Sequence, residues 1–180
     1  MQSPLDIIET EQYWLSSRHV SDSSKIGGNG YFSEHGVTRP KHVQSEDLPP
    51  AANDAVRKID HDALEEQKLI GKWQVTGSAE QIEKMWPEFV ADAASGVIWA
   101  VKAMTTYGYN NLSMYDDYLF TVYTPNYFER HDVFRVREHL RDAHGVTHQL
   151  YYKPDIYTAK GVVADTAEEF GLAVPARYIA

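Results

Sequence analysis

Two apolar segments with no helix between them constrain the fold of this chain most. Residues 97–104 (VIWAVKAM) are largely apolar on both faces and predict a central strand, and residues 118–124 (YLFTVYT) predict the next one. Between them, residues 105–117 are polar and rich in turn-forming residues. Parallel neighbours need a long crossover connection, usually a helix, so this connection favours an antiparallel pair.

Further elements are predicted before this pair. Residues 51–70 carry alanine, valine, isoleucine and leucine near helical spacing. Residues 71–76 (GKWQVT) alternate as a strand, which places Lys72 and Trp73 on opposite faces. The chain therefore predicts a helix and then a strand with one polar face.

A helix with an apolar stripe is expected next. Ser78 and Gln81 form a capping-box pair at its start, and Gly96 is expected to end it. Pro87 lies inside the stripe, so the helix is predicted to kink there or to divide into two short pieces.

Two more capped helices are predicted in the C-terminal part. Asp132 is expected to cap a helix that Gly145 ends, and Thr166 with Glu169 to form the capping box of a short helix. With the helix-free connection described above, these elements favour an α+β fold over a parallel Rossmann-like sheet. We expect a mostly antiparallel sheet with two or three helices on one face.

Length and composition indicate one folded domain with an N-terminal arm. The chain has 180 residues, 43% hydrophobic and 12% aromatic, enough for a proper core. Residues 49–180 are predicted to form a single α+β domain, and residues 1–48 a flexible or docked arm. Gly-Gly-Asn-Gly at 27–30 lacks the Gly-Lys-Ser/Thr that completes a phosphate loop. No apolar run reaches the roughly 18 residues of a membrane span, so no membrane partner and a cytoplasmic location are expected.

Charge and cysteine content exclude several classes of function. The net charge of -9 weighs against binding duplex DNA through many phosphate contacts, although a local basic pocket remains compatible with it. The chain has no cysteine, which excludes disulfides, thiolate metal sites and cysteine nucleophiles. His144 and His148 lie four apart, but Gly145 should end the helix between them, so we expect no metal site and no cofactor.

The run at residues 149–163 (QLYYKPDIYTAKGVV) is predicted to be a hairpin with a polar site at its corner. Pro154 restricts the direction in which Lys153 leaves the strand, and Asp155, Tyr157 and Thr158 follow closely. The alternative is an ordinary corner whose tyrosines pack and whose charges are solvated.

Cationic and aromatic side chains near the strands suggest a phosphate site. Lys72, Lys102 and Lys153 lie in or beside predicted strands, and Lys102 needs a partner or an exit to solvent. Together with Arg137 and Arg141 they can converge on a phosphate, and Trp73 and Trp99 are candidates for stacking on a base. The alternatives are solvated surface charges and tryptophans that pack in the core.

Several motifs carry a resemblance to a known family. They are Gly71-Lys72-Trp73, Trp86, Ala100-Val101-Lys102, Thr121-Val122-Tyr123-Thr124, Arg141, and Tyr152-Lys153-Pro154-Asp155-Ile156-Tyr157-Thr158 followed by Gly161. On these residues, the chain from Leu69 to Val163 resembles the family named after the basophilic-leukaemia-expressed protein. The resemblance implies a fold similar to that of the cap-binding translation initiation factor, a curved antiparallel sheet backed by helices. It also implies a phosphothreonine lyase activity, to which Lys102 or Lys153 with Arg141 would contribute.

Three hypotheses follow, and whether the protein is an enzyme is left open among them. The favoured one is a binding domain for a phosphorylated ligand, a nucleotide or an RNA end, with Lys72, Lys102, Arg141 and Lys153 on the phosphate. The second is a phosphothreonine lyase. The third is a non-catalytic domain that binds a protein partner and whose polar cluster is structural.

Overall fold

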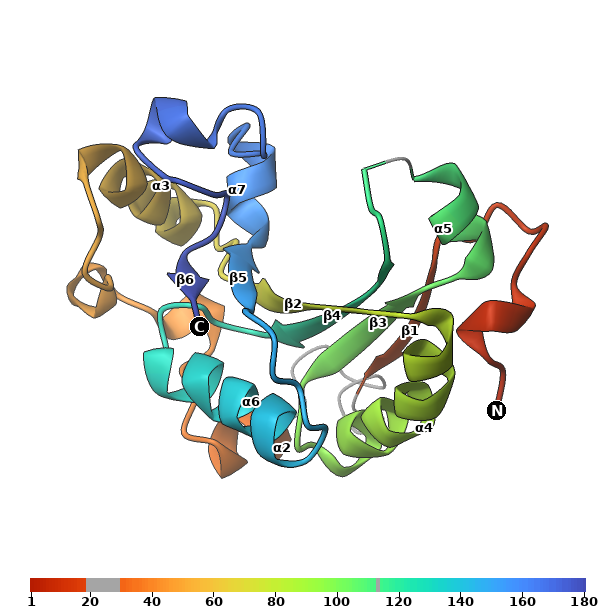
Figure 1. Ribbon diagram of the computed structural model, residues 1–180. Helices are drawn as coiled ribbons and strands as arrows, with labels where there is room; N and C mark the ends of the chain where they lie inside the picture. The colour runs from red at the N-terminus through yellow and green to blue at the C-terminus, as the bar shows by residue number, and fades with distance from the viewer. Residues whose placement is uncertain (19–29, 113) are drawn as a thin grey trace.

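The computed structural model describes residues 1–18, 30–112 and 114–180, and their central element is a curved antiparallel sheet (Figure 1). Its six strands lie in the order β1-β3-β4-β2-β5-β6, and every neighbouring pair is antiparallel. The strands are β1 (Trp14–Arg18), β2 (Gly71–Gly77), β3 (Ala100–Met104), β4 (Tyr118–Thr124), β5 (Tyr151–Pro154) and β6 (Tyr178–Ile179). The predicted α+β class and the antiparallel pairing of the two apolar segments are confirmed.

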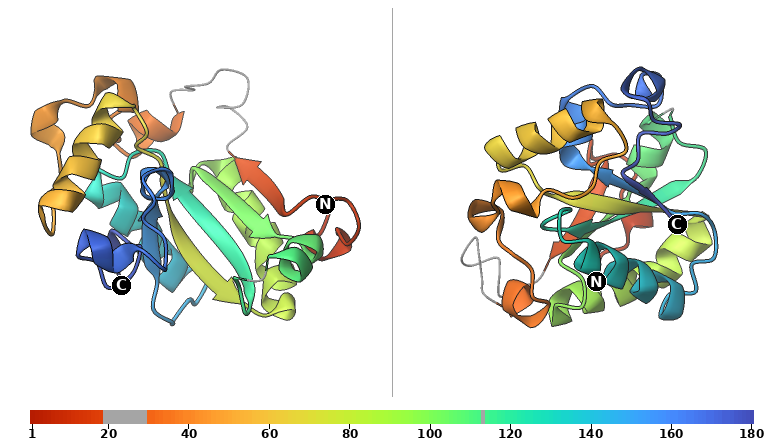
Figure 2. Two further views of the ribbon diagram at one scale, coloured as in Figure 1. Left: turned by 90° about the horizontal axis from the view of Figure 1, so that it is seen from above. Right: turned by 90° about the vertical axis from the view of Figure 1, so that its left-hand side faces the viewer.

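Helices flank the sheet unequally. The two long helices α4 and α6 cover one face, whereas α3 and α7 stand beyond the β5 end of the other face and α5 beside β1 (Figures 1 and 2). The α-helices are α2 (Gly30–Glu34), α3 (Asp54–Glu65), α4 (Ala79–Ser95), α5 (Thr106–Asn111), α6 (Arg130–Asp142) and α7 (Asp155–Ala159). Short 3-10 turns are η1 (Pro4–Asp6), η2 (Pro40–His42), η3 (Ser45–Asp47) and η4 (Ala167–Phe170).

Strand alternation separates an apolar face from a polar one. In β2, Trp73 and Val75 are buried beneath the helices, and the indole N–H of Trp73 donates to the carbonyl of Val133 in α6 at 2.8 Å. Tyr152 packs beside Trp73, with ring centroids 5.1 Å apart. A Cβ on Gly71 would lie only 2.6 Å from Cζ of Tyr152, so this buried ring requires glycine there.

The start of α4 is confirmed, and the helix is unbroken. The Ser78 side chain accepts the amide hydrogen of Gln81, and the Gln81 side chain accepts that of Ser78. Gly96 ends the helix with φ of 78°, a left-handed conformation that glycine adopts readily. Pro87 lies within a single helix rather than between two pieces.

Three local predictions are wrong. Residues 149–163 do not form a hairpin, because β5 runs directly into α7. Asp132 does not cap α6: it lies inside the first turn, and its buried carboxylate accepts hydrogen bonds from Tyr31 and Arg135. Thr166 makes no capping hydrogen bond, and the segment after it is the 3-10 turn η4.

The described part of residues 1–48 packs on the sheet. β1 pairs with β3 along its length, and Tyr31 of α2 is completely buried. The predicted loop at 105–117 contains α5, whose first turn is capped by the Thr105 hydroxyl. The glycine-rich run considered as a phosphate loop lies outside the described residues except for Gly30, where α2 begins. Within the part that the structure describes, no helix is both long and apolar enough to cross a membrane.

Candidate functional site

The face of the sheet opposite α4 and α6 gathers polar side chains from adjacent strands. Residues paired across an antiparallel ladder project to the same face. Lys72 in β2 pairs with Tyr123 in β4 on one side and with Lys153 in β5 on the other. These side chains are therefore cross-strand neighbours, although their positions in the sequence are far apart.

Tyr123 lies between two ammonium groups. The Nζ atom of Lys72 is 5.6 Å from the centroid of the Tyr123 ring, and the Nζ atom of Lys102 in β3 is 5.4 Å from it. Both distances are within the range of a cation–π contact, in which the electron-rich ring face attracts a cation. Lys102 is exposed, so it has the predicted exit to solvent, and Tyr123 lies close to both positive charges.

The site has more positive than negative charge. Lys72 forms an ion pair with Asp155, the first residue of α7. The pKa of Lys153 is lowered, first by burial and then by the nearby charge of Lys72, and Asp155 only partly opposes this effect. Among the described residues, Asp155 is the one carboxylate in an ion pair with any of these three lysines. An anion placed here would therefore reduce an existing repulsion.

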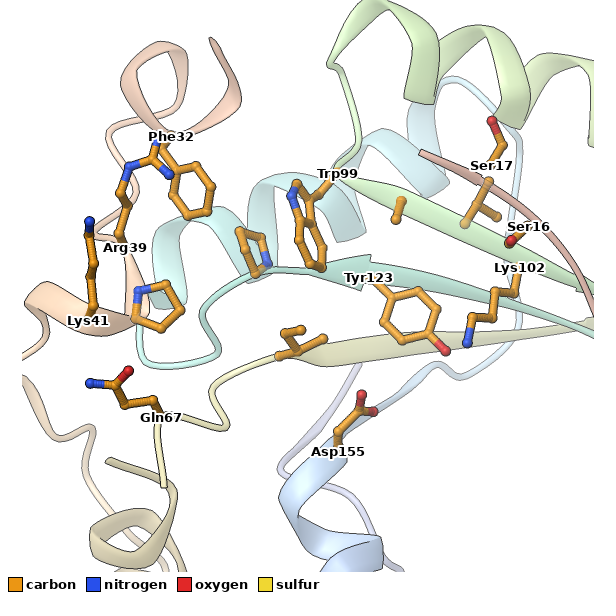
Figure 3. A pocket seen from close by; sticks show the side chains of 15 residues that line it. Ser16, Ser17, Phe32, Arg39, Lys41, Gln67, Trp99, Lys102, Tyr123 and Asp155 are labelled. Carbon is orange, nitrogen blue, oxygen red and sulfur yellow. The ribbon is translucent and has the colours of Figure 1, made fainter. Parts of the chain in front are cut away.

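A cavity of about 530 Å³ opens on this side of the sheet, and its lining includes Lys102, Tyr123 and Asp155 of this group (Figure 3). It is bounded by the polar face of the sheet and by the segment from α2 to η2. Trp99, Tyr123 and Lys102 line it from the sheet side, and Phe32 and Arg39 line it from the other. The Arg39 guanidinium lies 4.3 Å from the Phe32 ring centroid. A cavity with aromatic walls and a few cations suits a flat, anionic ligand.

The structure brings together only part of the predicted site. Lys72, Lys102, Lys153 and Asp155 share the polar face, and Trp99 lines the cavity. The prediction for Trp73 is corrected: its side chain is completely buried on the opposite face, because adjacent residues of a strand point in opposite directions.

Arg141 and the two residues that follow Ile156 do not join this group. Arg141 lies on α6, on the helix-covered face, and donates to the carbonyls of Val146, His148 and Ala180. Tyr157 is buried and lines a separate cavity of about 320 Å³ with Arg177, and Thr158 is exposed on α7.

Sequence reasoning missed the wall contributed by the N-terminal arm. Phe32, Arg39 and Lys41 line the cavity but lie in short segments with no periodic pattern. The face on which Tyr123 lies can be predicted, because strand alternation from 118 to 124 places it on the face opposite to that of Val122. Its position between two lysines depends on strand register, which the alternation does not give.

These features define the class of protein: an α+β domain with a curved antiparallel sheet, the helices α4 and α6 on one face, and on the other a group of lysines beside a cavity with aromatic walls. Residues 18–161 match the family of the basophilic leukemia-expressed protein Bles03. The chain belongs to that family, as its motifs indicated.

Two solved structures similar to the chain are both of schistosome eIF4E. One, complexed with m7GpppG and 4E-BP, is 13% identical with a TM-score of 0.45, and the match covers 83% of this chain and 79% of that one. The other, complexed with m7GpppA and 4E-BP, is 14% identical with a TM-score of 0.40, covering 69% of each chain. eIF4E is the cap-binding translation initiation factor whose fold the family resemblance implies.

Proposed function

We propose that the polar face of the sheet binds a phosphorylated ligand, either a nucleotide or the end of an RNA. The observation that carries the proposal is the position of Lys72 and Lys102 at the Tyr123 ring, with Lys153 beside Lys72 and, among the described residues, Asp155 as the carboxylate paired with them. Hydrogen bonds between an ammonium group and a phosphate are short and strong. The phosphate would be held over Tyr123, within reach of Lys102 and in competition with Asp155 for Lys72.

The aromatic wall of the cavity provides a place for a base. Trp99 is half-buried and lines the cavity near Tyr123, and Phe32 faces it from α2 (Figure 3). Stacking of a base on an aromatic side chain contributes about 1 to 3 kcal/mol where it occurs. A nucleotide would therefore place its base toward Trp99 and Phe32 and its phosphates toward the lysines.

The structure gives less support to the two other hypotheses, a structural polar cluster and a phosphothreonine lyase. Lysines that lie far apart would favour a purely structural polar cluster, whereas Lys72 is a direct neighbour of Lys153 and shares Tyr123 with Lys102. A phosphothreonine lyase retains one supporting observation, the lowered pKa of Lys153, which suits a lysine base. It loses the predicted arginine clamp, because Arg141 lies on the other face.

A nucleotide panel tests the binding proposal. ATP, GTP, the corresponding nucleosides and inorganic phosphate are titrated by calorimetry against the parent protein and against Lys102→Ala, Lys153→Ala and Lys84→Ala. Lys84 is an exposed lysine of α4 on the opposite side of the sheet and serves as the matched control. Loss of one charged hydrogen bond costs about 1.5 to 3 kcal/mol, so we expect the first two variants to bind triphosphates about tenfold to a hundredfold more weakly.

The control variant should match the parent. Higher salt should weaken the binding of the triphosphates, whose charges are screened, and should leave the binding of the nucleosides unchanged. The proposal fails if no nucleotide binds, or if Lys102→Ala and Lys153→Ala bind triphosphates as tightly as the parent. Loss of phosphoric acid from a phosphothreonine peptide, followed by mass spectrometry, would instead support the lyase.

A further inference from the structure

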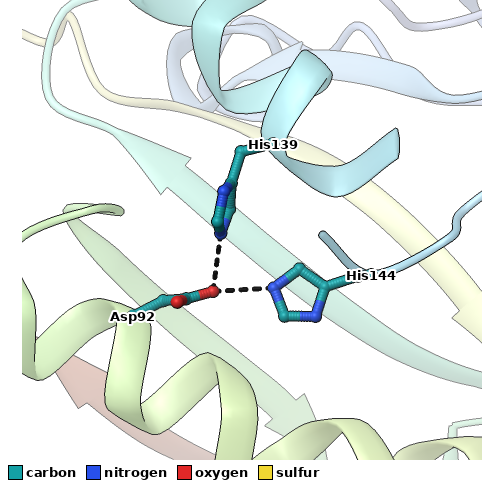
Figure 4. Close-up of side chains that lie close together, drawn as sticks. All are labelled: Asp92, His139 and His144. Carbon is teal, nitrogen blue, oxygen red and sulfur yellow. Dashed lines mark hydrogen bonds and ion pairs between the residues drawn. The ribbon is translucent and has the colours of Figure 1, made fainter. Parts of the chain in front are cut away.

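A second cluster of chemically active side chains lies on the helix-covered side, where α4 and α6 meet. Asp92 belongs to the last turns of α4, His139 to the last turn of α6, and His144 to the segment that follows α6. One ligand atom from each of the three lies within 4.8 Å of the others (Figure 4). We propose that these three side chains bind a divalent transition-metal ion of the zinc type.

The geometry already approaches that of a coordination shell. The Nε2 atoms of His139 and His144 each lie 2.7 Å from the same Asp92 oxygen, Oδ2. Ligand atoms on a tetrahedral zinc ion, with bonds near 2.0 to 2.1 Å, are about 3.3 Å apart. Side-chain rotations that open these contacts by roughly half an ångström would admit the ion. Two imidazole nitrogens and one carboxylate oxygen form a ligand set that suits zinc better than calcium or magnesium.

The second nitrogen of His144 provides an independent observation. Its Nδ1 atom lies 3.2 Å from Oε2 of Glu88, one helical turn before Asp92. A metal-ligating histidine commonly donates its other ring N–H to a carboxylate, which fixes the ring orientation. A metal ion on Nε2 leaves the ring N–H on Nδ1, which is the nitrogen that faces Glu88. A metal ion between Nε2 and Asp92 satisfies both contacts at once.

Packing holds the ring in place while leaving a route to solvent. The His144 side chain is only 3% exposed and lies against Phe89, with ring centroids 4.3 Å apart. The side chains of His139 and Asp92 are each 21% exposed. The three residues leave a fourth position for water or another ligand, as in zinc sites with three protein ligands. The bound ion would link the two long helices.

This site differs from the histidine pair considered in the sequence. His148 lies four residues after His144, but it is exposed, and the cluster uses His139 instead. His148 therefore gives a matched control within the same segment. The proposal is independent of the nucleotide site, which lies on the opposite face of the sheet.

Zinc titration of the full chain tests the proposal. Protein freed of metal by a chelator is titrated with zinc chloride against a chromogenic chelator, and bound zinc is counted by elemental analysis. We expect one tightly held zinc per chain and a melting temperature that rises with zinc. Glu88→Gln should weaken binding about tenfold to a hundredfold, as is typical for a carboxylate that orients a ligating histidine. His139→Gln and Asp92→Asn should weaken it further, and His148→Gln should leave it unchanged.

Circular dichroism of each metal-free variant checks that it is folded. Glu88 is 52% exposed, so its variant keeps the test decisive even where a change at a less exposed ligand unfolds the chain. The proposal is overturned if the parent binds no stoichiometric zinc, or if folded Glu88→Gln and His139→Gln bind it as tightly as His148→Gln does.

Discussion

Replacing Asp132 with asparagine should destabilise the protein strongly, because it breaks a buried ionic network. The Asp132 side chain is completely buried. Its carboxylate accepts hydrogen bonds from the Tyr31 hydroxyl at 3.0 Å and from Nε and Nη2 of Arg135 at 3.0 and 2.8 Å. Arg135 also donates to the carbonyl of Val97. The network connects α6 to α2 and to the segment before β3.

The expected loss is a large fraction of the total stability. Asparagine keeps the shape of aspartate but lacks its charge, so Arg135 loses its charged partner, and the amide NH₂ brings a donor toward other donors. Breaking one side of a buried ion pair costs about 3 to 5 kcal/mol. Typical domains are stable by only about 5 to 15 kcal/mol. With a urea m-value of about 2 kcal/mol/M, the unfolding midpoint should fall by about 1.5 to 2.5 M.

Urea unfolding, followed by tryptophan fluorescence, measures the midpoint. Glu138→Gln is the control, because Glu138 lies on the same helix, pairs with Arg137 and is 53% exposed; exposed pairs contribute at most about 1 kcal/mol. Hydrogen exchange should also rise in α2, which Tyr31 anchors and which carries Phe32 of the cavity wall. A midpoint for Asp132→Asn that matches the control would refute the reasoning.

Two further predictions follow from β2 and β5. Gly71→Ala should cost about 1 to 3 kcal/mol in chemical unfolding because its Cβ would meet the buried Tyr152 ring, whereas Gly77→Ala would meet only the movable Gln81 side chain and should cost less. The pKa of Lys153 in the folded protein is below its ordinary value of 10.5. Between these two pKa values the unfolded chain binds more protons than the folded chain, so the free energy of unfolding should rise with pH in that interval. Lys153→Met should flatten this rise in unfolding midpoints measured across the interval, and an unchanged slope would contradict it.

Local patterns predicted β2, the antiparallel pair β3 and β4, and the ends of α4, but not the strand registers. Alternation in residues 71–76 correctly predicted that Lys72 and Trp73 lie on opposite faces of the sheet, and the capping residues located both ends of α4. The meeting of Lys72 with Lys153 depends on strand pairing between distant segments, which no local pattern encodes. The cluster of Asp92 with His139 likewise depends on how two helices pack.

The misread junction at Pro154 has a physical explanation. A proline after a strand is typical of a turn, which favoured a hairpin. Here Pro154 is the last residue of β5 and also the N-cap of α7, and its extended conformation, with φ of -63° and ψ of 141°, suits both positions. The amide of Asp155 bonds to the carbonyl of Ile70 at 2.9 Å, so the helix starts against the entrance of β2. The sequence alone does not contain that long-range contact.

The position of β2 in the sheet has a consequence for how the chain reaches its native state. Gly71 pairs with Thr124 on one side and with Pro154 on the other, while Trp14 of β1 pairs with Met104. Pairing between distant segments requires a large loop to close, at a cost in entropy, before the stabilising contacts form. Proteins rich in such pairings therefore fold slowly. During synthesis, β2 has neither neighbour when it leaves the ribosome, and its second one arrives only with residues 151–154. The strand that carries Lys72 and Trp73 therefore cannot pair on both edges until most of the chain has been synthesised.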